Sequence, residues 1–247
     1  MLELKNIQVA IRKNILLNQI SAYFESGKIT GILGPNGSGK SSLLKTICGL
    51  YTPFVGKVFW QGSDLHQMTR KKRSQIVSMV PQVTHNYFDF SVYEIVEMGL
   101  YARGSKSFEK VYHAMKQCDV WHLRQRNICT LSCGEQQRVY IARSLATEAP
   151  VLLLDEPTAS LDIRHQLEVV EVLQELKHQD KMILISIHDL AFAEKICDHV
   201  LVLNHGEVRG QGKFSSVITN ELLFEVFNVS FEDFCLLNRN GSGFVAN

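Results

Sequence analysis

The stretch of sequence that decides the fold is Gly34-Pro35-Asn36-Gly37-Ser38-Gly39-Lys40-Ser41, which fits the pattern G-x-x-x-x-G-K-[ST]. It follows the apolar run 29–33 and precedes the helix-like run SLLKTICGL, residues 42–50. A strand, a glycine-rich turn and a helix in this order make a concavity whose backbone N–H groups and helix N-terminus hold phosphate oxygens. We expect Lys40 to reach the β- and γ-phosphates of a nucleotide, and the Ser41 hydroxyl to bind Mg²⁺.

The segments around this loop predict an α/β fold. The first sixty residues contain short alternating or apolar runs typical of strands, at 2–11, 15–24, 28–33 and 57–61. Helical sequence begins at Ser91-Val92-Tyr93-Glu94, a capping-box pattern. Residues 108–123 continue it, with Val111, Ala114, Met115 and Cys118 on one face.

Strands and helices alternate in the second half of the chain. The apolar runs 151–156 and 181–189 predict strands buried on both faces. The segment 163–179 predicts a helix with Leu167, Val170 and Leu173 facing inward. A hairpin with its turn at 204–206 and a helix at 219–227 follow.

We therefore expect a single domain spanning residues 1–247, with the P-loop NTPase core of an α/β protein. The core and its N-terminal antiparallel β layer comprise residues 1–84 and 151–247. A helical insert covers approximately residues 85–150.

Two adjacent acids, Asp155 and Glu156, end the apolar run that begins at residue 151. Ligands of open α/β sheets bind at the carboxyl ends of strands. Beside a phosphate-binding loop, we expect Asp155 to hold Mg²⁺, through water, and Glu156 to orient and polarise an attacking water molecule.

The composition argues against nucleic acid as a partner. The chain has 26 basic and 25 acidic residues and a net charge of +1, which gives no long-range field to attract a polyanion. No apolar run approaches the roughly 18 residues of a spanning helix, and no signal sequence is evident, so we expect a cytoplasmic protein. The six cysteines include no C-x-x-C pair and are interpreted as free thiols.

Four further motifs carry a resemblance to a known family. Leu131-Ser132-Cys133-Gly134-Glu135-Gln136-Gln137-Arg138 resembles the signature motif of ABC ATPases. Gln82 matches the family's Q-loop, Ser160-Leu161-Asp162 its D-loop, and His188 its switch histidine. With the glycine-rich loop, these motifs stand in the family's order and cover nearly the whole chain.

The resemblance implies an ATPase that uses ATP and Mg²⁺ and works as a head-to-tail homodimer, in which each ATP lies between the phosphate loop of one subunit and the signature of the other. Ser132 would face the γ-phosphate across the dimer as a helix N-cap. The implied catalytic residues are Glu156, His188 and Gln82, and the implied metal-binding residues are Ser41, Gln82 and Asp155. The residues implied in nucleotide binding are Gly34, Pro35, Asn36, Gly37, Ser38, Gly39, Lys40, Ser41, Ser42, Ile11, Ser132, Cys133, Gly134, Glu135, Gln136 and Asp162.

Two positions depart from the family pattern. The first glycine of the signature is Cys133, whose side chain we expect to crowd the site and reduce turnover without abolishing it. The aromatic residue that stacks on adenine in many relatives is replaced by Ile11, which cannot stack. We expect weak selectivity between nucleobases, because aromatic stacking is worth about 1–3 kcal/mol.

The family assigns such a chain to the cytoplasmic face of the cell membrane, where it pairs with polytopic permease subunits and, through them, with an external solute-binding protein. The neighbourhood of residues 85–90 resembles the groove that receives a permease helix. Residues 90–101 and 220–229 are similar to importers of iron(III)-siderophores, haem and cobalamin. The alternatives are an importer of zinc or manganese, a non-hydrolysing regulatory subunit, and a soluble ABC ATPase of translation or DNA maintenance.

Overall fold

The computed structural model describes residues 1–82, 89–104, 106–159 and 161–230. Three features of the sequence fall outside these ranges. They are Ser160 of the D-loop pattern, residues 85–88 of the expected permease groove, and Cys235.

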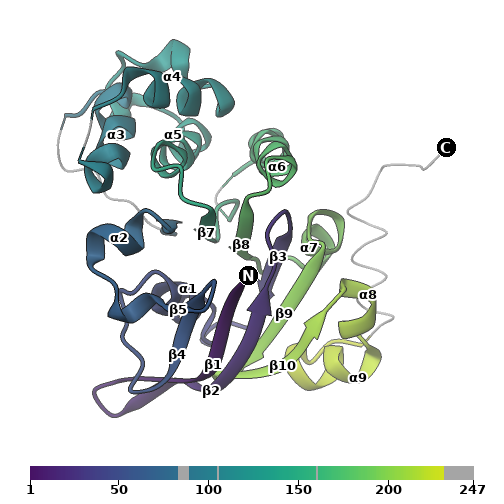
Figure 1. The fold of residues 1–247 in the computed structure, drawn as a ribbon. Helices are drawn as coiled ribbons and strands as arrows, with labels where there is room; N and C mark the ends of the chain where they lie inside the picture. Colours follow the sequence, from purple (N-terminus) through teal and green to yellow (C-terminus); the bar gives the residue numbers. More distant parts are fainter. Residues whose placement is uncertain (83–88, 105, 160, 231–247) are drawn as a thin grey trace.

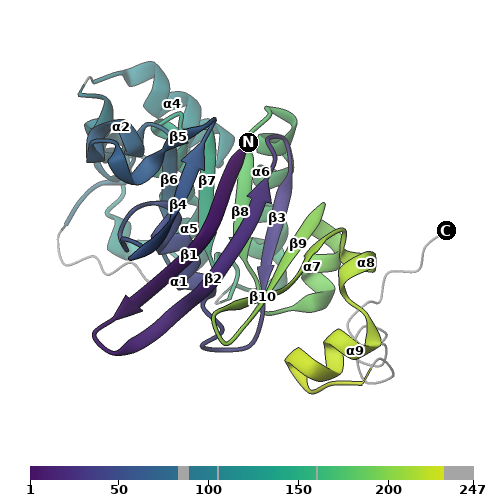
Figure 2. The same ribbon diagram turned by 60° about the horizontal axis from the view of Figure 1, so that its bottom comes forward.

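The first layer is an antiparallel sheet in the order β2-β1-β4-β5. Its strands are β1 (Leu2–Ile11), β2 (Asn14–Phe24), β4 (Val55–Trp60) and β5 (Ser63–Asp64). Buried Leu2 and Leu4 alternate with more exposed side chains along β1, so one face of the sheet packs inward. Figure 2 shows β1 and β2 crossing in front of the second sheet.

The second layer is a sheet in the order β10-β9-β3-β8-β7-β6. Only its edge strand β10 is antiparallel to its neighbour. Every residue of β3, β7 and β8 is buried, as the unbroken apolar runs predicted. The strands are β3 (Ile29–Leu33), β6 (Val77–Val80), β7 (Val151–Asp155), β8 (Met182–Ser186), β9 (His199–Asn204) and β10 (Glu207–Gly212).

Helix α1 (Lys40–Ile47) lies between the two sheets. Its buried Leu43, Leu44 and Ile47 join one hydrophobic cluster with side chains from both sheets. Alternate residues of β7 point into different clusters: Leu153 packs toward α1, and Leu154 packs toward the helices on the opposite face. The parallel sheet is therefore covered on both sides, which confirms the α/β class.

Helices α3, α4 and α5 stand together between β6 and β7 in the chain (Figure 1). Both α3 and α4 pack against α5, and the four α4-region residues predicted to face inward are buried. The α-helices between α1 and β7 are α2 (Arg70–Ser74), α3 (Val92–Glu97), α4 (Phe108–Gln117) and α5 (Cys133–Ala146). Short 3₁₀ helices cover Leu65–Gln67, Met98–Arg103, Trp121–Leu123 and Ile128–Thr130.

The remaining helices follow β7. They are α6 (Ile163–His178), α7 (Leu190–Ile196), α8 (Phe214–Val217) and α9 (Asn220–Leu222), with a π-helix at Leu223–Phe227. The longest described helix, α6, has 16 residues, and none of the helices in the described ranges has the length and apolar character to cross a membrane.

The predicted inward face of α6 was right for Leu173, which is buried, and for Val170, which packs against the core, but wrong for Leu167. Leu167 is 57% exposed, and the buried stripe comprises Val169, Val172, Leu173 and Leu176. This stripe has the i, i+3, i+4, i+7 spacing of one helix face. Apolar residues occur on two faces of α6, so the pattern alone could not say which of them meets the sheet.

Candidate functional site

The glycine-rich loop joins β3 to α1. Gly39 is the N-cap of α1 and has a φ of 108°, in the left-handed region that favours glycine. A Cβ at Gly39 would lie 2.9 Å from Leu17 Cδ2 and 3.0 Å from the Leu16 carbonyl oxygen. The glycine therefore lets the loop turn tightly against β2, and it aims the free N–H groups of α1 at the concavity.

Lys40 curls back across this loop. Its ammonium donates to the carbonyl oxygens of Gly34, at 2.8 Å, and Pro35, at 3.1 Å. Burial lowers the pKa of Lys40, against the opposing effect of the Glu156 and Asp155 carboxylates. The Ser38 hydroxyl is buried, and no described residue gives it a hydrogen-bond partner. A buried donor and a desolvated cation facing a concavity are a good match for a polyphosphate.

Asp155 sits beneath the loop, at the end of β7. Its Oδ1 accepts hydrogen bonds from the hydroxyls of Ser41, at 2.9 Å, and Ser186, at 2.8 Å. The carboxylate is 2% exposed. The oxygens of Ser41 and Asp155 are hard ligands of the kind that Mg²⁺ prefers. Together with the oxygens of a bound phosphate, these residues fit a magnesium ion.

Glu156, the next residue, engages both of its carboxylate oxygens. Gln82 Nε2 donates to Oε2 at 2.6 Å, and His188 Nε2 bonds Oε1. The backbone of Glu156 has a φ of 50°, uncommon for a non-glycine residue, and its N–H donates to Ser186 Oγ at 2.8 Å. Glu156 lines the pocket with a side chain that is 11% exposed, while Asp155 stays buried.

The sheet order explains why these residues meet. Strands β3, β8, β7 and β6 are parallel neighbours, so their carboxyl ends lie along one edge. That edge supplies the glycine-rich loop after β3, His188 after β8, the two acids at β7 and Gln82 after β6.

The pocket at this edge has a volume of about 850 Å³. It is lined by most of the predicted loop together with the side chains that surround Glu156. The lining residues are Ile15, Leu16, Asn36, Gly37, Ser38, Gly39, Lys40, Ser41, Ser42, Gln82, Glu156, His188, His205 and Gly206. Gly34, Pro35 and Asp155 lie just behind this lining, bonded to Lys40 and Ser41.

Ile11 is not among the lining residues, contrary to the expectation that it contacts a nucleobase. It ends β1, pairs with Asn14 across the hairpin and is 41% exposed. Ile15, which is 64% exposed, and Leu16 line the pocket instead. The nucleobase contact of Ile11 therefore stays a prediction, and Ile15 and Leu16 are further candidates for it.

The signature residues are not part of this pocket. Ser132 is the N-cap of α5, in a capping box with Glu135: Ser132 Oγ accepts from the Glu135 N–H at 3.3 Å, and Glu135 Oε2 accepts from the Ser132 N–H at 2.8 Å. Cys133 is exposed, Gly134 is buried, and Gln136 Nε2 donates to the Leu131 carbonyl oxygen. Asp162, also outside the pocket, is the N-cap of α6.

Sequence reasoning missed one residue that organises the site. Ser186 is fully buried and pairs in register with Asp155 across β7 and β8. Its hydroxyl donates to Asp155 and accepts from the Glu156 N–H, so it holds both acids at once. The only signal in the sequence was that Ser186 is a polar residue near the end of the apolar run 181–189.

A parallel sheet whose strand ends carry a glycine-rich phosphate loop, two acids and a histidine defines a P-loop nucleotide-binding domain. The sequence model of the family described as ABC transporter matches residues 17–159, more than half of the chain. The chain therefore belongs to the ABC transporter family, as one of its ATP-binding domains.

Individual relatives agree with this assignment. The chain is 37% identical over 233 residues to the cobalamin import ATP-binding protein BtuD of Halobacterium salinarum, covering 92% of this chain but only 58% of that relative's length. It is 36% identical over 237 residues to the hemin import ATP-binding protein HmuV of Pseudomonas entomophila, covering 93% of both chains. A solved dimeric bacterial ABC transporter cassette superposes with a TM-score of 0.78 at 27% identity, over 87% of this chain and 99% of its own. The expected ABC-type fold is thus confirmed.

Proposed function

We propose that the protein hydrolyses ATP to ADP and phosphate to drive an ABC importer. The observation that carries this proposal is the convergence at one sheet edge of the Lys40 loop, the Ser41–Asp155 pair and the Gln82–Glu156–His188 network. Each of these three groups has a separate task, and all three lie where the phosphates of a bound nucleotide would end.

The residues divide the reaction as follows. Lys40 and the N–H groups of the loop bind the phosphates, and Ser41 with Asp155 would hold Mg²⁺, whose charge neutralises the phosphate oxygens when it is bound. Glu156 orients the attacking water and accepts its proton. His188 and Gln82, already bonded to Glu156, stand at the γ-phosphate end.

The second half of each site comes from another copy of the chain. Within one subunit the pocket contains neither the signature residues, from Ser132 to Gln136, nor Asp162. A head-to-tail homodimer would bring these residues of one subunit onto the pocket of the other. The dimeric cassette that resembles this chain supports such an arrangement. Closure then becomes a condition for hydrolysis, which links chemistry to motion.

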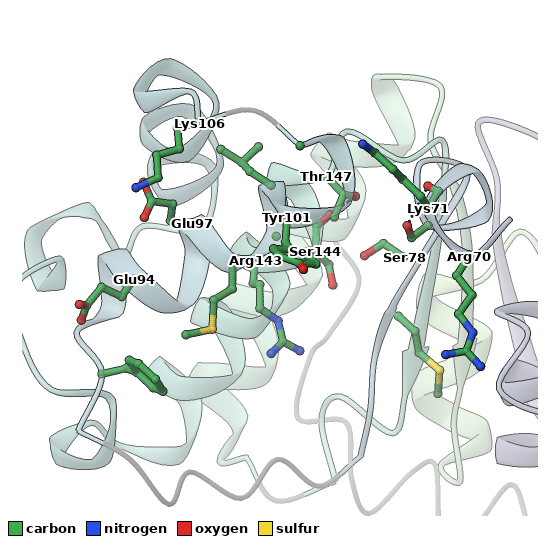
Figure 3. A pocket seen from close by; sticks show the side chains of 17 residues that line it. Arg70, Lys71, Ser78, Glu94, Glu97, Tyr101, Lys106, Arg143, Ser144 and Thr147 are labelled. Atoms are coloured by element: carbon green, nitrogen blue, oxygen red, sulfur yellow. Dashed lines mark hydrogen bonds between the residues drawn. The ribbon is translucent and has the colours of Figure 1, made fainter.

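The permease binds in a groove between the core and the helices of residues 85–150, which form a helical subdomain. This groove, of about 1220 Å³, is larger than the nucleotide pocket and lies apart from it. Figure 3 shows its side chains: Arg70 and Lys71 come from α2, and Glu94 and Glu97 from α3. Apolar residues such as Leu100 also line the groove, a composition suited to an amphipathic helix. Binding there places the chain on the cytoplasmic face of the membrane.

The transported solute is a metal chelate such as iron-siderophore, haem or cobalamin. The printed names of two relatives, a cobalamin and a hemin import protein, support this class. The solute contacts the permease and an external solute-binding protein, so it touches no residue of this chain.

The mechanism is tested by Glu156→Gln and Lys40→Ala. Glu156→Gln keeps nucleotide binding but removes the proton acceptor, so we expect turnover to fall about 10²-fold or more and an ATP-dependent dimer to accumulate. Lys40→Ala weakens nucleotide binding itself. Single-turnover hydrolysis, fluorescent-nucleotide titration and size-exclusion chromatography measure the three effects. Unchanged turnover in Glu156→Gln, or full activity in a strictly monomeric wild type, would refute the proposal.

A further inference from the structure

The N-termini of α5 and α6 touch within one subunit. Gly134, in the first turn of α5, lies against the imidazole of His165 on α6. A Cβ built at Gly134 would stand 2.2 Å from His165 Cδ2 and 2.4 Å from Cγ, far inside van der Waals contact. The ring therefore occupies the space that a side chain at position 134 would take, and only glycine lets the two helix starts approach this closely.

The other edge of the same ring is bonded to the D-loop aspartate. His165 Nδ1 lies 2.8 Å from Asp162 Oδ1, and the same oxygen accepts from the His165 N–H at 2.9 Å. These contacts from His165, the backbone hydrogen bond first, lower the pKa of Asp162. A carboxylate has only acceptor oxygens, so Nδ1 is the donor in this hydrogen bond. The ring is thus fixed between Asp162 and Gly134.

A second contact holds the two helices one turn further on. Arg138 of α5, which is 7% exposed, forms an ion pair with Glu168 of α6. Arg164 also pairs with Glu168, at 3.3 Å. Residues 134 and 138 share a face of α5, and 165 and 168 share a face of α6, so the helix starts are joined at two levels.

From this geometry we infer that His165 is a positioning residue that holds the D-loop carboxylate of Asp162 in register with the signature helix of the same subunit. The inference rests on the proposed function, in which Asp162 and the signature both act on the nucleotide of the other subunit. Because the His165 ring touches both the D-loop aspartate and the signature helix, these two elements approach the nucleotide of the other subunit together. His165 itself needs no contact with nucleotide.

The hydrogen bond is tested with His165→Phe and His165→Asn. Phenylalanine keeps a ring beside Gly134 but has no donor, whereas asparagine places an N–H at the position of Nδ1. We expect His165→Phe to lower kcat about tenfold with the KM for ATP unchanged, and His165→Asn to retain most of the wild-type rate. The matched control is His122→Phe, because His122 also follows an aspartate by three residues, but its Nδ1 lies 3.9 Å from Asp119.

A wild-type kcat in His165→Phe, an effect on KM alone, or an equal loss in His165→Asn would overturn the positioning role. The steric contact has its own test, which needs no activity. Gly134→Ala should lower the melting temperature in the wild-type background and lower it much less in a His165→Ala background, where the ring is gone and only the Cβ of residue 165, 2.9 Å away, remains. Equal falls in both backgrounds would refute the contact. A wild type that fails to hydrolyse ATP would refute the proposed function, and the melting cycle would still decide whether His165 links the two helices.

Discussion

Replacing Ser186 by alanine tests whether one buried hydroxyl holds both acids of the site. The change removes a 2.8 Å bond to Asp155 and leaves the Glu156 N–H without its 2.8 Å acceptor. A buried unsatisfied N–H costs about 1–3 kcal/mol, and a hydrogen bond to a charged group is worth about 1.5–3 kcal/mol. Because Asp155 keeps its bond from Ser41, we expect a total loss of about 2–4 kcal/mol in unfolding free energy.

That loss corresponds to a fall of roughly 5–15 °C in melting temperature for a chain of this size. Turnover should fall about tenfold at a temperature where the variant is folded, because Glu156 depends on this bond for its backbone position. Differential scanning calorimetry and a steady-state phosphate-release assay measure the two quantities.

The matched control is Thr147→Val. The Thr147 hydroxyl also donates to one acceptor, the Ser144 carbonyl oxygen at 2.7 Å, and accepts from one N–H, that of Ala149 at 3.1 Å. It lies in the groove of Figure 3, away from the nucleotide pocket, so the control should lose stability and keep the turnover of the isolated subunit. Wild-type turnover in Ser186→Ala, or an equal loss of turnover in Thr147→Val, would refute the reasoning.

Three further predictions concern the signature, the nucleobase and the pH. Cys133→Gly should raise ATP turnover, by up to about tenfold, because overpacking by one side chain costs about 1–3 kcal/mol; a lower turnover in steady-state assays would contradict it. GTP should be hydrolysed nearly as well as ATP, because Ile15 and Leu16, which line the pocket, offer a nucleobase apolar contact without ring stacking; a tenfold or greater preference in kcat/KM for ATP would show another contact. Burial alone would raise the pKa of Asp198, but hydrogen bonds from Lys177, at 2.6 Å, and from the Ile29 N–H, at 2.9 Å, outweigh it and lower this pKa from 3.8. The carboxylate therefore stabilises the fold above pH 3.8, and this stabilisation is lost as the pH falls through the lower pKa that Asp198 has in the folded state. In chemical denaturation at a series of pH values, Asp198→Asn should therefore make the unfolding free energy fall less steeply toward acid pH. An unchanged acid dependence would count against this role of Asp198.

Features encoded by local sequence could be predicted. The glycine-rich loop, the buried strands, the capping box at Ser91 and the N-cap at Ser132 depend on residues close together in the chain, and the structure shows each of them. The position of Asp155 and Glu156 followed from the rule that ligands bind at the carboxyl ends of parallel strands, whereas Gln82 and His188 were implied by the family resemblance.

Features set by tertiary contacts could not be predicted. The buried face of α6 depends on which of its apolar stripes meets the sheet. Leu167 is apolar, like a core residue, but it is exposed. Which side chains of the β1–β2 hairpin line the pocket depends on how the hairpin packs against the loop, and Ile15 lines the pocket whereas Ile11 does not. Ser186 became visible only when the register of β7 and β8 set it beside Asp155.

The meeting of four strand ends at one edge has an evolutionary consequence. Gaining or losing one residue inside β6, β7 or β8 would turn every later side chain of that strand to the other face of the sheet and move its terminal group off the nucleotide. Links that carry no site residue have no such penalty, because they can lengthen at the surface at small entropic cost. Insertions and deletions should therefore accumulate in those links among descendants of this chain, while the strand lengths stay constant.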